Sequence, residues 1–192
     1  MSAYRHLDLS RIKNTKLREI TLALAWGDRH DAGFAGEALA RESLTALGLE
    51  YVEVDQSKET LHPELKRAGG KRPDFILQTE LDEHVVLVDA KYHDTTGRVF
   101  KLEVEEIEKF LALQRYTESL CPGAKVEVIF WVFPQRSVGN VFAAVWLDEI
   151  AAGTLCKFDD RPARAVDISS RLLDPKTGEL ASPEQCEEKR KA

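Results

Sequence analysis

The chain has 192 residues and a formal net charge of −6 at pH 7, from 27 Lys and Arg against 33 Asp and Glu. Hydrophobic residues make up 43% and charged residues 31%, the profile of a soluble globular protein that can bury a sizeable core. The charge argues against a protein coated in positive charge for non-specific nucleic-acid binding. No apolar run approaches the roughly 18 residues of a membrane-spanning helix, so no membrane partner is expected.

The cysteines and the start of the chain bear on the compartment. Cys121, Cys156 and Cys186 are odd in number and widely spaced, which suggests neither a disulfide framework nor a zinc knuckle. The first residues lack the apolar core of a secretory signal. We therefore expect a cytoplasmic site of action, and an unusual export route stays open.

Residues 1–32 are predicted to form an N-terminal helical extension. Between positions 17 and 26 the apolar residues follow helical spacing, with basic residues on the first half. An accessory helix docked on the core explains this pattern. An arm that contacts phosphates is the alternative.

A helix is expected over residues 34–47, ending at Gly48. Its apolar stripe includes Ala40 and Leu44, and three residues before Ala40 the same stripe holds Glu37. A carboxylate on a buried stripe is uncommon unless it is paired or binds a metal. An acid favoured by the helix dipole is the plainer explanation.

The rest of the chain is expected to build an α/β fold, with a mixed central sheet and helices on its faces. Residues 56–71 are expected to be a polar loop and residues 92–98 a turn-rich loop, and a disordered tail is expected over 174–192. The predicted strands cover 49–55, 72–78, 85–91, 126–133 and 141–147, and the predicted helices 102–118 and 148–155.

The strands at 72–78 and 85–91 are expected to pair as a hairpin that carries charged residues. Side chains alternate along a strand, so Asp89 and Lys91 share one face at the end of an apolar run. Asp74 stands early in the preceding strand, directly after a proline. Salt bridges from these acids to Lys91 and Arg72 are the plainest explanation.

The helix at 102–118 is strongly amphipathic. Its apolar residues, Val104, Ile107, Phe110, Leu111 and Leu113, are expected to face inward, and Glu103, Glu105, Glu106 and Glu108 to form an acidic outer face. Gln114 falls on the inward stripe, and Tyr116 lies close by.

Three carboxylates, Glu37, Asp74 and Asp89, cannot all stay ionised and unpaired in one partly buried pocket. A hard divalent cation resolves this, because Mg²⁺ accepts carboxylates together with water and substrate phosphate oxygens. Such a metal polarises a phosphoryl oxygen and lowers the pKa of bound water. Lys91 can hold the attacking water and balance charge in the transition state.

The pattern Pro73-Asp74 followed by Asp89-Ala90-Lys91, preceded by a helix with Glu37 after Gly36, resembles the PD-(D/E)XK nuclease superfamily over residues 33–133. The resemblance implies a restriction-endonuclease-like core in the order helix, three strands, helix, strand, within a domain at 33–173. It implies Mg²⁺- or Mn²⁺-dependent phosphodiester hydrolysis, with Glu37, Asp74, Asp89 and the Ala90 carbonyl as metal ligands and Lys91 as the catalytic lysine. Some relatives carry a glutamine and a tyrosine on the second core helix, so the resemblance also makes Gln114, and after it Tyr116, candidates to support the site.

A metal-dependent nuclease, and among nucleases a DNA endonuclease, is the expected function. It would be either a host enzyme for repair, restriction or defence, or the toxic domain of an antibacterial effector with an immunity protein. A tRNA-cleaving toxin, a homodimer and an inactive nucleic-acid- or protein-binding module on the same fold stay open. The residues expected to contact phosphates are Arg67, Lys71, Arg72, Arg98 and Lys101.

Overall fold

The structure is a computed structural model of the whole chain. It describes residues 35–56, 60–77, 79, 83–93, 98–134, 137, 140–182 and 186. The predicted N-terminal extension at 1–32 lies outside these residues. No helix in the described part of the chain is long and apolar enough to cross a membrane.

The described residues fall into two compact units. The first takes its residues from Glu50–Val88 and Glu108–Val128. The second takes them from Gly33–Leu49, Asp89–Ile107 and Ile129–Ala192. Each unit is therefore assembled from separate stretches of the sequence.

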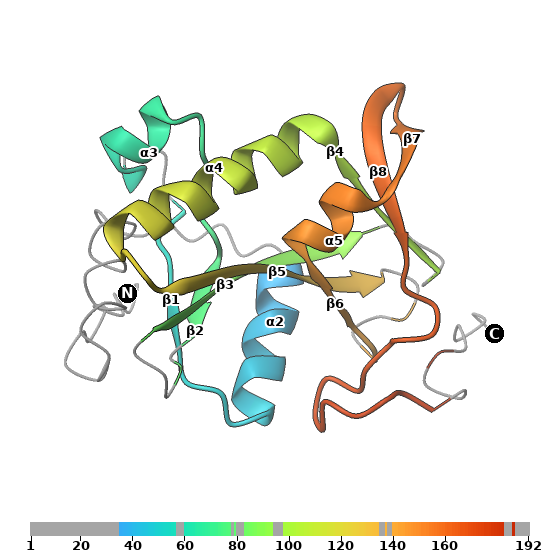
Figure 1. Cartoon of the computed structure of the whole chain (residues 1–192). Coiled ribbons are helices and arrows are strands. Elements are labelled where there is room, and N and C mark those ends of the chain that lie inside the picture. Colours follow the sequence, from blue (N-terminus) through green and yellow to red (C-terminus); the bar gives the residue numbers. More distant parts are fainter. Residues whose placement is uncertain are drawn as a thin grey trace, which may run out of the picture. The chain divides into compact units, whose positions relative to one another are not determined.

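The fold is mixed α/β, as predicted, with a mixed five-stranded sheet flanked by helices. The strand order is β1-β2-β3-β5-β6 (Figure 1). These strands are β1 (Tyr51–Glu53), β2 (Phe75–Leu77), β3 (His84–His93), β5 (Lys125–Pro134) and β6 (Ala143–Trp146), and the helices are α2 (Ala35–Ala46), α3 (Pro63–Arg67), α4 (Val104–Leu120) and α5 (Leu147–Ala152).

The predicted hairpin is confirmed in the first unit. Strands β2 and β3 pair antiparallel, with Phe75 opposite Val88 and Leu77 opposite Val86. On its other side β2 pairs antiparallel with β1. The paired residues Phe75 and Val88 are fully buried, as expected of apolar side chains on an inner strand.

The polar loop predicted at 56–71 is wrong in one part, because it contains α3. Pro63 begins this helix, where its fixed φ suits the first turn and no N–H is needed. Leu65 anchors the helix in the core. Gly70 follows at a close approach, since a Cβ there would lie 2.3 Å from Cδ1 of Leu65. A buried leucine thus ties this otherwise polar segment to the core.

The second unit contains a three-stranded antiparallel sheet that the sequence did not predict. Its order is β4-β8-β7, with β4 at Val99–Glu103, β7 at Thr154–Phe158 and β8 at Arg161–Asp167 (Figure 1). Asp159 and Asp160 join β7 to β8 with φ values of 48° and 62°, the left-handed conformation that tight two-residue hairpin turns require. The short helix predicted at 148–155 therefore ends early, and its last residues belong to β7.

The prediction of a disordered tail from residue 174 is also wrong for residues 174–182. Leu173 bridges both Phe142 and Leu180. Between these bridges the Asp174 carboxylate accepts hydrogen bonds from the backbone N–H groups of Lys176 and Thr177, at 2.7 and 3.2 Å. Gly178 supplies a φ of 71°. A polar, Gly-containing segment is ordered here because its turn is closed by backbone bonds.

Candidate active site

The end of β3 carries the acid and the lysine predicted from the sequence, both in the second unit. Asp89 is 2% exposed, and its Oδ2 atom lies 2.5 Å from Nζ of Lys91. The lysine side chain is 17% exposed. The salt bridge considered as the plainest explanation of these charges is therefore present.

A second carboxylate contacts the same lysine. Glu106, in the first turn of α4, places Oε1 2.8 Å from Lys91 Nζ. The prediction that Glu106 belongs to an acidic outer face is wrong. Residues four apart share a helix face, so Glu106 continues the buried stripe of Phe110 toward the start of the helix. That spacing is the sequence signal for Glu106.

The pKa of Lys91 follows from this pairing. Burial disfavours the ammonium and alone would lower the pKa, but the charges of Asp89 and then Glu106 outweigh it. The pKa of Lys91 is therefore raised above its ordinary value of 10.5. The ammonium also lies 6.0 Å from the centroid of the Phe130 ring. At neutral pH Lys91 is a cation held by two carboxylates.

In the second unit the start of α2 also packs against β3. A Cβ on Gly36 would lie 3.0 Å from the backbone nitrogen of Tyr92 and 3.6 Å from the carbonyl carbon of Lys91. Glu37, the next residue, is 7% exposed. The glycine thus lets the helix that carries Glu37 rest on the strand segment that carries Lys91.

We expect Gly36→Ala to destabilise the protein. Extra atoms in a packed contact cost about 1–3 kcal/mol, while the helical preference of alanine returns at most about 1 kcal/mol. The free energy of unfolding, measured by denaturant titration, should fall by about 1 kcal/mol, and more with Gly36→Ser. An increase in stability, the usual effect of alanine at an open helical glycine, would contradict the close approach.

Asp74 lies in the first unit, directly before β2. Its backbone N–H donates to the carbonyl of Val88, and its own carbonyl accepts from Val54 N, each at 2.9 Å. The residue before it is held by Gln56, whose Nε2 donates a hydrogen bond to the Pro73 carbonyl at 2.7 Å. Arg72 is buried and donates to the Thr60 hydroxyl. Val88 immediately precedes Asp89 in the chain, so backbone pairing fixes the register of Asp74 on β3.

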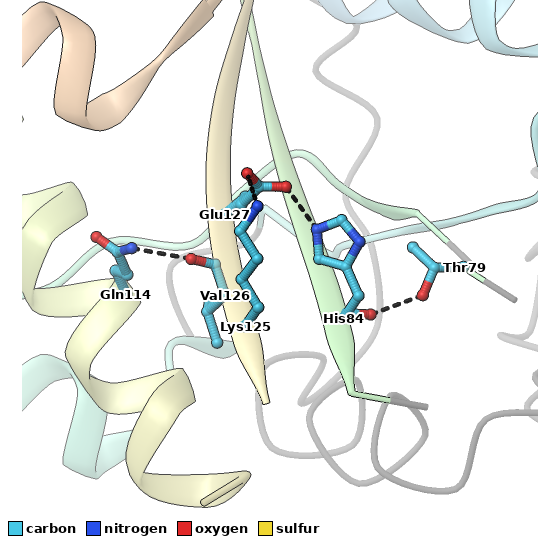
Figure 2. Close-up of polar contacts among 6 residues, drawn as sticks. All are labelled: Thr79, His84, Gln114, Lys125, Val126 and Glu127. Carbon is cyan, nitrogen blue, oxygen red and sulfur yellow. Dashed lines mark hydrogen bonds and ion pairs between the residues drawn. The ribbon is translucent and has the colours of Figure 1, made fainter. Parts of the chain in front are cut away.

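Gln114 and Tyr116, predicted to support the site, make their contacts within the first unit. The Gln114 amide donates to the Val126 carbonyl at 2.9 Å (Figure 2). The Tyr116 hydroxyl and His62 Nδ1 lie 2.9 Å apart. Burial raises the pKa of Tyr116, and the charge of Glu64 adds to this effect. These two contacts join α4 to its surroundings and involve none of the predicted acids.

A polar cluster that the sequence did not single out spans β3 and β5 in the first unit. Glu127 Oε2 lies 2.5 Å from His84 Nε2, and its Oε1 lies 2.7 Å from Lys125 Nζ (Figure 2). The Thr79 hydroxyl donates to the His84 carbonyl at 2.6 Å. The Lys125 hydrogen bond lowers the pKa of Glu127, and the His84 hydrogen bond adds to this against the opposing effect of burial.

This cluster predicts a pH-dependent contribution to stability. Because the folded-state pKa of Glu127 lies below its ordinary value of 4.5, its stabilisation is present above pH 4.5 and is lost as the pH falls through the folded pKa. Glu127→Gln should cost about 1 kcal/mol at pH 7, and this cost should shrink progressively as the pH falls below 4.5 through the folded pKa. Denaturant titrations across a pH series check this, and a loss that does not change with pH would contradict it.

The five basic residues predicted to contact phosphates differ in their surroundings. Arg67 is exposed, 3.6 Å from Glu64, and Arg98 is exposed just before β4. Lys71 lies 4.4 Å from the centroid of the Phe110 ring. Lys101 is half-buried in β4, and Arg72 is buried in the turn before Asp74. Arg67 and Arg98 are therefore the two most accessible of the five.

The donor set of the second unit suits a hard cation. Glu37, Asp89 and Glu106 offer carboxylate oxygens, the ligands that Mg²⁺ and Mn²⁺ prefer. In the described residues no three His, Cys, Asp or Glu side chains are already disposed around a common metal position. The Oδ2 atom of Asp89 lies 2.5 Å from the Lys91 ammonium, so a cation that bound this oxygen would compete with the ammonium.

Comparison of the chain with protein-family models, with curated proteins and with solved structures finds no match.

Proposed function

We propose that this chain is a metal-dependent nuclease that hydrolyses phosphodiester bonds in DNA, on a restriction-endonuclease-like core. The observation that carries the proposal is the acid and lysine two residues apart at the end of β3, with the Glu37 helix packed against the backbone beside Lys91. The resemblance to the PD-(D/E)XK superfamily rests on the same residues.

In this proposal Glu37, Asp74, Asp89 and the Ala90 carbonyl hold Mg²⁺ or Mn²⁺. The bound cation would supply a polarised phosphoryl oxygen and a water of lowered pKa. Lys91 donates hydrogen bonds that orient the attacking water and offset charge on the phosphate oxygens. Attack by the water oxygen on phosphorus forms one P–O bond as the bond to the departing oxygen breaks, and the proton that the water loses balances the proton that the departing oxygen takes up.

A cleavage panel tests the function. Supercoiled DNA, linear DNA, single-stranded DNA and tRNA are incubated with purified protein in Mg²⁺, in Mn²⁺ and in chelator. We expect metal-dependent cutting of DNA that stops in chelator. Cutting of tRNA alone would move the substrate to RNA. Cutting of none of these nucleic acids, with metal binding confirmed, would overturn the nuclease.

A non-catalytic binding module on the same fold is a second candidate. It is favoured by the ion pair itself, because Lys91 neutralises Asp89 without a metal. Calorimetry with Mn²⁺ separates the two functions, since the module needs no cation. Heat of Mn²⁺ binding that disappears in Asp89→Asn supports the nuclease, and the absence of such heat in the wild type supports the module.

The biological setting follows from expression of the gene alone in the cytoplasm of a bacterium. Toxicity that requires Asp89 and is cured by a neighbouring gene supports an antibacterial effector with an immunity protein. Growth without toxicity supports a host enzyme for repair, restriction or defence, acting alone, as a homodimer or with other subunits.

Substitutions of two arginines are expected to have different effects, because one arginine is exposed to solvent and the other is buried. Arg67→Gln should weaken DNA binding and reduce the salt slope of log K by about 1, without a change in unfolding. Arg72→Gln should lower the free energy of unfolding by about 2 kcal/mol, because its partners in the turn are buried. Fluorescence anisotropy across a salt series and denaturant titration measure the two effects. A reversed pattern would contradict the burial of Arg72.

A further inference from the structure

We propose that Glu106 is a positioning residue, which draws the Lys91 ammonium away from Asp89 and so makes that carboxylate available to a divalent cation. The inference rests on the proposed function, because it concerns the metal site of that function. It adds a residue and a step of charge exchange that the nuclease pattern does not contain.

The geometry places one ammonium between two carboxylates from different elements. Lys91 Nζ lies 2.5 Å from Asp89 Oδ2 on β3 and 2.8 Å from Glu106 Oε1 on α4. An ammonium has three N–H donors, so it can serve both carboxylates at once. Loss of either contact leaves the lysine with an ionic partner.

A cation that binds Asp89 meets this ammonium as a competitor. A cation at the Asp89 oxygen that already lies 2.5 Å from the ammonium would be repelled by it, and little solvent screens this repulsion because Asp89 is 2% exposed. The ammonium can leave Asp89 at low cost only if another carboxylate receives it, because a buried charge without a partner is unstable. Glu106 meets this need from α4, and its side chain is 30% exposed. The ammonium therefore moves toward the better solvated of its two partners.

Calorimetric titration with MnCl₂ alone tests the inference through a double-mutant cycle. The four proteins are the wild type, Glu106→Gln, Lys91→Met and the double variant, and Glu108→Gln, exposed on the same helix, is the matched control for charge. Glu106→Gln should weaken Mn²⁺ binding about tenfold when Lys91 is present and by less than about threefold when Lys91 is replaced. Glu108→Gln should leave the affinity unchanged.

An equal loss of affinity in both backgrounds would overturn the inference, because Glu106 would then act directly on the cation. No loss in either background would overturn it as well. Glu106→Asp keeps the charge and shortens the reach, so it should resemble Glu106→Gln; wild-type affinity in this variant would contradict a role through contact with Lys91.

The cycle uses no nucleic acid, so its result is separate from that of the cleavage panel. The expected coupling in a protein that cuts nothing supports the inference and overturns the nuclease. Cleavage without coupling supports the nuclease and overturns the inference. A wild type that binds no Mn²⁺ overturns the inference directly.

Discussion

Lys91→Met is expected to abolish cleavage and to destabilise the metal-free protein. Cleavage should fall at least about 100-fold, the usual loss on removal of a group that stabilises transition-state charge. In chelator the free energy of unfolding should fall by about 3–5 kcal/mol, because removal of one partner leaves buried charge behind. Asp89 and Glu106 both lose their shared cation.

The measurements are a cleavage time course and denaturant titrations with chelator and with Mn²⁺. Mn²⁺ should restore part of the lost stability, since it replaces the missing positive charge. Lys157→Met, an exposed lysine on β7, is the matched control and should change neither property. An unfolding midpoint equal to that of the wild type in chelator would show that the ion cluster contributes nothing to stability.

Asp89→Asn is expected to remove cleavage with a much smaller effect on folding. The amide keeps the shape of the side chain but supplies no anionic ligand, so Mn²⁺ binding and cleavage should each fall at least about 100-fold. Lys91 retains Glu106 at 2.8 Å. The loss in free energy of unfolding should therefore stay near 1 kcal/mol, the value of a single hydrogen bond.

Calorimetry with MnCl₂, cleavage assays and denaturant titration measure these effects, and Asp148→Asn, an exposed acid on α5, is the control. The most decisive measurement is which of the two variants, Lys91→Met or Asp89→Asn, loses more stability. Lys91 pairs with both Asp89 and Glu106, and Asp89→Asn leaves it the second of these carboxylates, so Lys91→Met must be the more damaging change in chelator. The opposite order would contradict the shared ion pair.

Local patterns predicted much of the fold. The antiparallel pairing of β2 with β3 follows from two apolar runs separated by a polar connection. The burial of Glu37 follows from its place on the stripe with Ala40 and Leu44. Both signals lie within about twenty residues, where helix and strand periodicity are decisive.

The features that the sequence did not predict have two causes. One is pairing between segments that are distant in the sequence, and the other is that a face of α4 was assigned from charge alone. Strand β4, whose last two residues were assigned to the helix predicted at 102–118, pairs with β8, which begins at Arg161. Glu106 was grouped with its acidic neighbours, although its spacing to Phe110 places it on the buried side of α4. Charge alone did not identify it, because the lysine that pairs with it stands 15 residues earlier, on another element.

Strand β8 lies late in the sequence, and this position has a consequence for synthesis of the protein on the ribosome. Every residue assigned to the metal and to Lys91 has been made once Glu106 has been added, but the strand that pairs with β4 ends at Asp167. Until then β4, which leads directly into α4, lacks its sheet neighbour. A nascent chain therefore carries the full set of site residues about 60 positions before the support of Glu106 can form.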